Sequence, residues 1–226
     1  MFERTQKIKR MSMARDLVTA IDMKSPISEQ FRSIRTMLSF MMPASLKTIA
    51  VTSTIAGEGK STTAANMGIV FAQEGKRVLL IDADLRKPTL HHTFKLENEC
   101  GLADVLAQKN TYTEAVQDTF LVGLSVMTCG QVPLHPAELF TSSTFSAFLE
   151  EVKEHFDLVL FDAPPLLLVP DAQLLVNKCD ATIFVVHAGL VKRGMALRAK
   201  ALLKASQANT LGVVLNQYKT VNYEYY

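Results

Sequence analysis

The feature that most constrains the fold is a series of short apolar runs, each separated from the next by a longer polar or helix-like segment. Most of these runs are continuous rather than alternating, which predicts strands buried on both faces, as in a parallel sheet covered by helices. The runs are Thr48–Thr52, Val78–Ile81, Leu124–Thr128, Leu158–Phe161, Thr182–Val186 and Leu211–Leu215. The helical segments are Ser28–Met41, Ser61–Gln73, Phe145–His155, Asp171–Asn177 and Met195–Ser206. This order predicts an α/β fold with a doubly wound, mostly parallel sheet flanked by helices.

Length and composition restrict the class of protein further. A chain of 226 residues suits one domain with short appendages. The net charge of +2, from 24 basic and 22 acidic residues, argues against a general nucleic-acid binder. The 3 cysteines are widely spaced and include no C-x-x-C pair, which favours a reducing compartment over a disulfide scaffold or a zinc site. No segment has the pattern of a signal peptide or a membrane-spanning helix, so we expect a cytoplasmic protein.

The chain divides into three parts by composition. Residues 1–24 are basic and are expected to be flexible, residues 25–216 carry the alternating pattern, and residues 217–226 form a polar, tyrosine-rich tail. Of the 5 tyrosines, four lie in the last nine residues: Tyr218, Tyr223, Tyr225 and Tyr226. A packed core would spread its aromatic residues, so this cluster calls for a different explanation.

A glycine-rich loop follows the first apolar run and precedes a helix. Backbone N–H groups of such a loop and the N-terminus of the following helix cradle phosphates. In this arrangement Lys60 reaches the β- and γ-phosphates and the Ser61 hydroxyl binds Mg²⁺. Thr54 replaces the first glycine of the usual G-x-x-x-x-G-K-[ST] pattern, so the loop is a deviant form, and an ordinary glycine-rich turn is the alternative. The candidate nucleotide-binding residues are Ala56, Gly57, Glu58, Gly59, Lys60, Ser61 and Thr62.

Acidic residues end two further apolar runs. Asp82 and Asp84 are two residues apart, and on an extended chain such side chains point the same way, here toward the crevice that the loop faces. One carboxylate would hold a metal and the other would orient or deprotonate an attacking hydroxyl. Arg86 would stabilise phosphate charge or pair with a carboxylate. Asp162 ends the run Leu158–Phe161 and suits a Mg²⁺ ligand. The alternative for Asp82–Arg86 is a solvated loop with an internal ion pair.

Taken together, these motifs resemble the bacterial tyrosine kinases of capsule and exopolysaccharide synthesis. That family consists of P-loop NTPases, unrelated in fold to eukaryotic protein kinases. Ala56–Thr62, Leu79–Arg86 and Leu158–Asp162 are similar to its Walker A, Walker A′ and Walker B motifs. The run I-D-A-D-L-R-K-P at residues 81–88 is the most specific part. The resemblance covers nearly the whole chain from about Ser25, and it implies that residues 25–216 form a P-loop kinase domain.

The resemblance implies an ATP- and Mg²⁺-dependent protein-tyrosine kinase that autophosphorylates its tail and regulates exopolysaccharide synthesis in capsules or biofilms. Asp82 is the expected activator of the tyrosine hydroxyl, and Asn216 lies where related folds read adenine, with a strand-terminal turn residue as the alternative. The implied catalytic residues are Lys60, Asp82, Asp84 and Arg86. The implied metal ligands are Ser61, Asp84 and Asp162. The implied phosphorylation sites are Tyr218, Tyr223, Tyr225 and Tyr226.

The family resemblance also implies partners. Glu29, Arg32 and Arg35 match an E-x-x-R-x-x-R motif on a helix that mediates ring-like self-association in the family. At i, i+3 and i+6 these side chains lie along one face, and an internally paired, solvated face is the alternative. On the opposite stripe, Phe31, Ile34 and Leu38 are expected to dock on the body. The chain resembles the stand-alone cytoplasmic type, which implies a separate transmembrane activator that recruits the kinase to the inner face of the membrane. Further implied partners are protein tyrosine substrates and a cognate tyrosine phosphatase, but no nucleic acid.

Two other functions remain open from the sequence. A partitioning or positioning ATPase of the same superfamily would hydrolyse ATP with water, but it carries a signature lysine where this chain has Ile55. A nucleotide-dependent assembly scaffold would keep the binding loop without catalysis. The three aspartates at the strand ends argue against lost catalysis.

Overall fold

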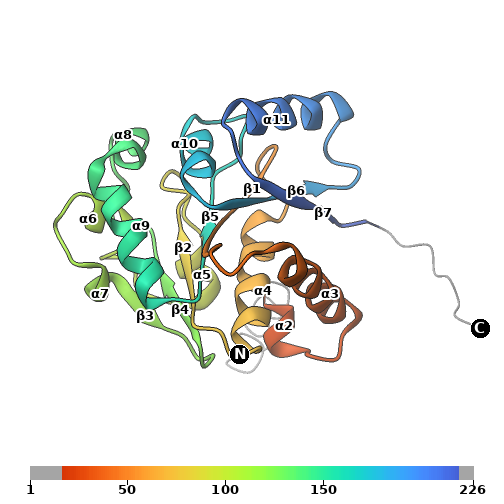
Figure 1. Ribbon diagram of the computed structural model, residues 1–226, viewed down its shortest axis with the longest axis horizontal. Helices are drawn as coiled ribbons and strands as arrows, with labels where there is room; N and C mark the ends of the chain where they lie inside the picture. Colours follow the sequence, from red (N-terminus) through yellow and green to blue (C-terminus); the bar gives the residue numbers. More distant parts are fainter. Residues whose placement is uncertain (1–16, 219–226) are drawn as a thin grey trace, which may run out of the picture.

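A single mixed sheet organises the chain in the computed structural model, which describes residues 17–218 (Figure 1). The strand order is β3-β4-β2-β5-β1-β6-β7, and every neighbouring pair is parallel except β3 and β4. The strands are β1 (Thr48–Ser53), β2 (Val78–Asp82), β3 (Val116–Asp118), β4 (Leu124–Met127), β5 (Leu158–Asp162), β6 (Ala181–His187) and β7 (Thr210–Asn216). The predicted doubly wound, mostly parallel α/β fold is confirmed.

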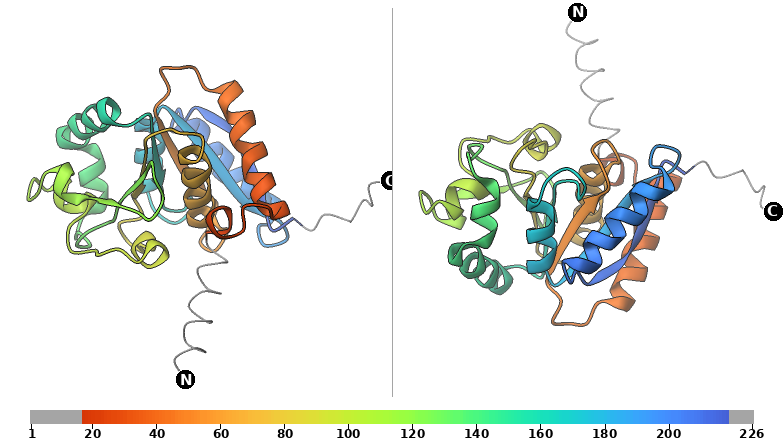
Figure 2. Two further views of the ribbon diagram at one scale, coloured as in Figure 1. Left: turned by 90° about the horizontal axis from the view of Figure 1, so that it is seen from below. Right: turned by 90° about the horizontal axis from the view of Figure 1, so that it is seen from above.

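Helices cover both faces of this sheet (Figure 2). One face packs against α2, α3, α4 and α5, and the other packs against α6, α8, α9, α10 and α11. The helices are α2 (Val18–Ile21), α3 (Pro26–Met41), α4 (Lys60–Ala72), α5 (Leu90–Phe94), α6 (Leu102–Leu106), α7 (Tyr112–Ala115), α8 (Pro136–Thr141), α9 (Ser143–His155), α10 (Asp171–Lys178) and α11 (Arg193–Ala205). Within residues 17–218, none of them is long and apolar enough to cross a membrane.

The central strands β1, β2 and β5 are buried along their whole length. Successive side chains of a strand point to opposite faces, so a strand between two helical layers needs apolar residues at every position. In β1, Ile49 and Val51 enter the core under α4, whereas Ala50 enters the core on the other face. The carboxyl ends of β1, β2, β5 and β6 meet at one edge of the sheet, where ligands bind in folds of this type.

Helix α3 begins at a well-formed cap. The Ser25 hydroxyl accepts a hydrogen bond from the Ser28 backbone N–H at 3.2 Å, and Pro26 occupies the first turn, where its missing N–H costs nothing. Leu38 is buried, and Phe31 and Ile34 pack against the same core as α4. The expectation that this stripe of α3 docks on the body is therefore confirmed.

The expectation that residues 1–24 are flexible is wrong for the segment that carries α2. Leu17 and Thr19 are fully buried. The Thr19 hydroxyl donates to the Asn66 side-chain oxygen at 2.8 Å, and the Gln73 side chain donates to the Thr19 carbonyl at 3.0 Å. These bonds attach α2 to α4, so the folded domain begins before residue 25. Residues 1–16 lie outside the described part of the chain.

Candidate active site

The glycine-rich loop connects β1 to α4 and needs glycine at two positions. Gly57 and Gly59 have φ angles of +85° and +86°, a region that residues with a Cβ atom rarely adopt. A Cβ atom on Gly59 would also lie 2.1 Å from the Asn216 side-chain nitrogen, whereas Gly57 faces open space. The loop thus exposes its backbone on the cavity side, as a phosphate cradle requires.

Glu58 anchors this loop to the rest of the sheet. Its buried carboxylate accepts hydrogen bonds from the backbone N–H groups of Ile55, at 2.6 Å, and His187, at 3.0 Å. Its own carbonyl accepts from the Asn216 side-chain nitrogen at 2.9 Å. The Glu58 side chain therefore points into the protein, and its candidate role in nucleotide binding is limited to the backbone.

Lys60 lies at the centre of the site between two carboxylates. Its Nζ atom is 3.1 Å from Asp84 Oδ2, 3.2 Å from Asp162 Oδ1 and 3.3 Å from the Ser61 hydroxyl. Burial acts to lower the pKa of Lys60, but the charges of Asp162 and Asp84 outweigh it, so the pKa is raised and the lysine is cationic. The sequence motifs of the loop and of the two strand ends therefore do meet in space.

The paired aspartates of β2 do not face the cavity together, as the sequence pattern predicted. Asp84 lines the cavity, whereas Asp82 is fully buried and its Oδ2 atom accepts from the backbone N–H groups of Thr89 and Leu90 at 2.8 and 2.9 Å. The reason is that β2 ends at Asp82, so the alternation of an extended strand no longer relates the two side chains. The prediction is wrong for Asp82 and correct for Asp84.

Asp82 and Asp162 are direct neighbours on strands β2 and β5. One oxygen of each carboxylate, Asp82 Oδ1 and Asp162 Oδ2, is buried without a hydrogen-bond partner. Burial, together with the charge of Asp162, raises the pKa of Asp82 to about 7. Burial also raises the pKa of Asp162, against the opposing effect of Lys60. Two unpartnered oxygens beside a lysine and a serine suit a site that receives a cation or a proton.

A cavity of about 760 Å³ opens beside the loop. Its lining residues come from the loop, the segment after β2 and the segment after β5: Ala56, Gly57, Gly59, Lys60, Ser61, Thr62, Asp84, Arg86, Lys87, Thr89, His92, Thr93, Lys95, Pro164, Pro165, Leu168 and Val169. Arg86 lines this cavity, and its guanidinium group pairs with the Asp171 carboxylate at 2.6 and 3.2 Å. Of the two roles that the sequence left open for Arg86, pairing with a carboxylate is the one observed.

Asn216 lies at the end of β7 against the glycine-rich loop. Its side-chain nitrogen donates to the Glu58 carbonyl at 2.9 Å, and its side-chain oxygen accepts from the Gln217 backbone N–H at 2.9 Å. Both halves of the amide are thus engaged with backbone groups. Recognition of adenine by Asn216 stays a prediction, and the contacts assign it a role in fixing the loop.

The E-x-x-R-x-x-R residues of α3 have different surroundings. Glu29 and Arg32 form an ion pair at 2.6 Å, with 66% and 25% of their side chains exposed. Arg35 instead donates to the Val70 carbonyl of α4 at 3.1 Å, and its side chain is 19% exposed. Arg35 therefore attaches α3 to its own domain, while Glu29 and Arg32 lie on the surface.

The tyrosines proposed as phosphorylation sites are only partly covered by the described residues. Tyr218 follows β7 and is 64% exposed. Tyr223, Tyr225 and Tyr226 lie outside the described part of the chain.

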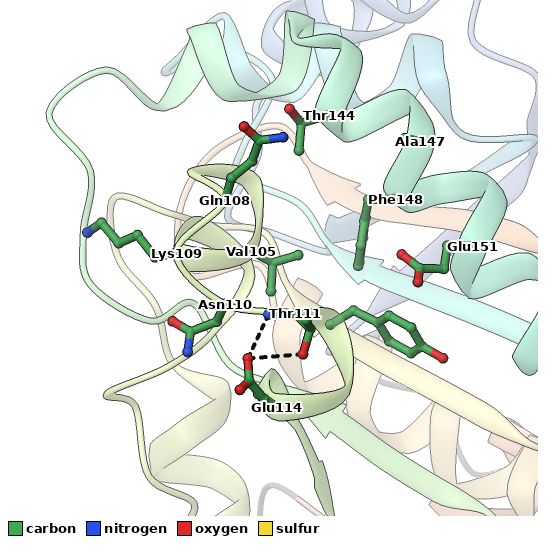
Figure 3. Close-up of a pocket in the computed structure, with 11 residues that line it drawn as sticks. Val105, Gln108, Lys109, Asn110, Thr111, Glu114, Thr144, Ala147, Phe148 and Glu151 are labelled. Carbon is green, nitrogen blue, oxygen red and sulfur yellow. Dashed lines mark hydrogen bonds between the residues drawn. The ribbon is translucent and has the colours of Figure 1, made fainter.

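A second hollow, of about 360 Å³, lies between α9 and the segment that carries α6 and α7 (Figure 3). Glu114 accepts hydrogen bonds from the backbone and hydroxyl of Thr111 at its rim, at 2.8 and 3.0 Å (Figure 3). The hollow shares no lining residue with the cavity beside the loop. None of the residues singled out by the sequence motifs lies there.

The residues of the cavity beside the glycine-rich loop fit a nucleotide and a divalent cation. The loop offers backbone N–H groups from Gly57 to Thr62 and a buried cation at Lys60, and Ser61 offers a hydroxyl. Asp84 and Asp162 offer carboxylate oxygens, of which one is unpartnered. In residues 17–218 there is no cluster of three or more His, Cys, Asp or Glu side chains that would hold a metal alone. A bound cation would therefore take phosphate oxygens of the nucleotide as ligands in addition to these side chains.

Comparison with known proteins agrees with this geometry. Residues 46–207 match the family model described as "AAA domain". The tyrosine-protein kinase YwqD of Bacillus subtilis is 43% identical over 215 residues, which cover 95% of this chain and 91% of YwqD. The crystal structure of the chimerical protein CapA2B2 is 36% identical and superimposes with a TM-score of 0.88, covering 91% of each chain.

More distant structures share the fold alone. The cell division ATPase MinD of Pyrococcus furiosus is 24% identical and has a TM-score of 0.65, covering 76% of this chain and 72% of MinD. The P-loop NTPase fold is common to MinD and to the tyrosine kinases. High sequence identity over nearly the full length, however, is found with the kinases. The chain belongs to the bacterial tyrosine-protein kinases that have a P-loop NTPase fold.

Proposed function

We propose that this chain transfers the γ-phosphoryl group of ATP to tyrosine hydroxyls, and that the tyrosines of its own C-terminal tail are among its substrates. The observation that carries the proposal is the cluster of Lys60, Asp84 and Asp162 at the mouth of the glycine-rich loop, with ion-pair distances of 3.1 and 3.2 Å. Such a cluster binds phosphate at the lysine and leaves carboxylates for metal binding and proton transfer.

The phosphates would bind along the backbone of Gly57–Thr62, with Lys60 on the β- and γ-phosphates. Ser61, Asp162 and Asp84 would hold Mg²⁺, which when bound neutralises charge on the phosphate oxygens. Lys60 now pairs with both aspartates. An arriving triphosphate offers this lysine another anionic partner, and the carboxylates then become available to other ligands.

Asp82 and Asp84 are the candidates for removing the proton from the tyrosine hydroxyl. A general base works best when its pKa is close to the working pH. Asp82 meets that condition with a pKa of about 7 and one unpartnered oxygen. Asp84 meets the geometric condition because it lines the cavity. We propose Asp82 as the residue that receives the proton, and Asp84 as the residue that positions the hydroxyl and the metal.

The tail is a suitable substrate because its four tyrosines follow the last strand in the sequence and surround an otherwise polar stretch. Tyr218 is already exposed where β7 ends. Attack by the tail of one copy on the site of another would require self-association, and the exposed Glu29–Arg32 pair on α3 is the proposed contact. A cognate tyrosine phosphatase would reverse the modification, and other proteins of exopolysaccharide synthesis would be further substrates.

Regulation by a separate membrane protein is the remaining part of the proposal. The similar structure CapA2B2 is a chimerical protein, and its name combines CapA with CapB. By analogy, a transmembrane activator would bind this chain and hold it at the cytoplasmic face of the membrane. Activity of the isolated chain would then be low.

The experiment is incubation of the full chain with Mg·ATP and the cytoplasmic segment of the activator, followed by detection of phosphotyrosine. We expect tail labelling that disappears in Lys60→Met and in a variant with Phe at the four tail tyrosines. A tail variant that keeps full labelling at Tyr112 would contradict the assignment of the tail. Nucleotide binding should be retained in the tail variant, which serves as the control for folding.

A further inference from the structure

One wall of the cavity beside the glycine-rich loop presents basic and neutral polar side chains. This wall is the segment 86–95, which follows β2 and carries α5. Its lining residues are Arg86, Lys87, Thr89, His92, Thr93 and Lys95. Lys87, His92 and Lys95 are exposed. The proposed function gives none of these basic groups a role.

The lysines of this wall, unlike its arginine, have no acidic partner in the described part of the chain. Arg86 is paired with Asp171 at 2.6 Å. Within residues 17–218, no ion pair involves Lys87 or Lys95. The one acidic residue that lines this cavity in the described chain is Asp84, and Lys60 holds it at 3.1 Å. An anionic group entering the cavity beyond the loop would therefore meet free cations.

The wall formed after β5 has the opposite character. Pro164, Pro165, Leu168 and Val169 line it, and 58% of Leu168 is exposed. An aromatic ring packs on such a surface, whereas a carboxylate does not. Neighbouring residues of an extended peptide point to opposite sides. A tyrosine placed against this apolar wall would thus direct the next side chain away from it.

We propose that Lys87 and Lys95 bind the carboxylate of an acidic residue adjacent to the target tyrosine, so that the kinase selects acidic tyrosine peptides. The inference rests on the proposed function and adds the substrate class. The chain's own tail has this character: Glu224 is the one acidic residue among residues 217–226, and it stands between Tyr223 and Tyr225. Carboxylate and ammonium groups attract each other weakly at partly solvated sites. The two lysines should therefore change the preference among peptides rather than supply most of the binding affinity.

The test uses three amidated, fluorescently labelled peptides with the sequence of residues 221–226: the native form, Glu224→Gln and Glu224→Lys. Their dissociation constants are measured by anisotropy on the full chain with a non-hydrolysable Mg·ATP analogue, and their KM and kcat are measured with Mg·ATP and the activator segment. The variants are Lys87→Gln/Lys95→Gln and Lys87→Glu/Lys95→Glu. Lys200→Gln, an exposed residue of α11 outside this cavity, is the matched control.

We expect the wild-type chain and Lys200→Gln to favour the native peptide over Glu224→Gln by about fivefold in dissociation constant and KM, with kcat unchanged. The double Gln variant should lose this preference, and the double Glu variant should favour Glu224→Lys. A folding defect would weaken the binding of all three peptides alike and would not reverse the preference for one peptide over another. Equal binding of the three peptides by the wild-type chain would overturn the inference.

The same measurements separate this inference from the proposed function. Phosphoryl transfer to all three peptides with the same KM would overturn the charge recognition but would still support the kinase reaction. Binding that follows the charge without any transfer would support the charge recognition and count against the kinase reaction. Affinity for the nucleotide analogue should be the same in both double variants, and a parallel loss of nucleotide binding would assign the lysines to phosphate and overturn the inference.

Discussion

Gly59 and Asn216 are in such close contact that a Cβ atom on Gly59 would lie 2.1 Å from the Asn216 side-chain nitrogen. The end of β7 thus rests on the phosphate loop, although 157 positions separate the two residues (216 − 59). The shape of the loop is set by this contact as well as by its own backbone.

The contact predicts unequal effects of alanine at the two loop glycines. Both have φ near +85°, so alanine is strained at either position by about 1 kcal/mol. Gly59→Ala also displaces Asn216, so we expect it to lower the free energy of unfolding clearly more than Gly57→Ala. Urea unfolding of the nucleotide-free chain measures the difference. Equal losses would show that the Asn216 contact does not constrain the loop.

Glu58 should act through the fold of the loop rather than through ligand contact. Glu58→Gln leaves one oxygen where the carboxylate has two, so one of the N–H groups of Ile55 and His187 loses its partner. An unsatisfied buried donor costs about 1–3 kcal/mol. We expect a loss of that size in urea unfolding together with weaker nucleotide binding. Unchanged stability with weaker binding would place the carboxylate at the ligand instead.

The buried pair Asp82 and Asp162 makes stability depend on pH. The pKa of Asp82 is raised to about 7 in the folded chain, from an ordinary value of 3.8. A raised carboxyl pKa means that the fold favours the protonated form, so the stabilisation is full below pH 4 and is lost as the pH rises through 7. Asp82→Asn keeps an acceptor for Thr89 and Leu90 and removes the charge. Relative to the wild type, the variant should therefore gain free energy of unfolding, and this gain should be about 1–3 kcal/mol larger at pH 8 than at pH 5.

The measurement for this pair is urea unfolding of wild type and Asp82→Asn at both pH values, with the exposed Asp22→Asn as control. A gain of the same size at pH 5 and pH 8, or none at either, would contradict the raised pKa. If Asp82 also receives the tyrosine proton, the same variant should lose phosphoryl transfer while gaining stability.

Variants of Arg35 and Glu29 on α3 should separate folding from association. Arg35→Ala removes the hydrogen bond to the Val70 carbonyl and should lower the free energy of unfolding by about 1–2 kcal/mol. Glu29→Ala removes a partner from an exposed ion pair and should leave unfolding unchanged. Urea unfolding and analytical ultracentrifugation of both variants test this. Weaker self-association in Glu29→Ala at unchanged stability is expected, and the reverse pattern would place the interface elsewhere.

The long elements are predictable from the sequence because their signals are local. Six of the strands are recognisable as short apolar runs, and the strand ends bring Lys60, Asp84 and Asp162 together as expected. The short strand β3 and the short helices α5 to α8 escape prediction, since three to six residues show no periodicity. Glycine positions and charged motifs reveal the loop because only such residues suit a phosphate cradle.

Contacts between distant residues cannot be predicted in the same way. The partner of Arg86 is Asp171, which lies 85 positions away and begins a different helix. The orientation of Asp82 depends on where β2 ends and on two backbone N–H groups near α5. The motif predicts a ligand role for Glu58 because of its position in the loop, whereas the fold uses its side chain as an anchor. Each outcome depends on tertiary packing.

The fate of the γ-phosphate tests the central claim most directly. The full chain, with the activator segment added, is incubated with Mg·ATP labelled at the γ position, and protein-bound phosphotyrosine is measured against free inorganic phosphate over time. A tyrosine kinase of the proposed kind should place most of the early label on the tail tyrosines and none on the chain in Lys60→Met. Release of the label as free phosphate, with the tail unmodified, would contradict the account.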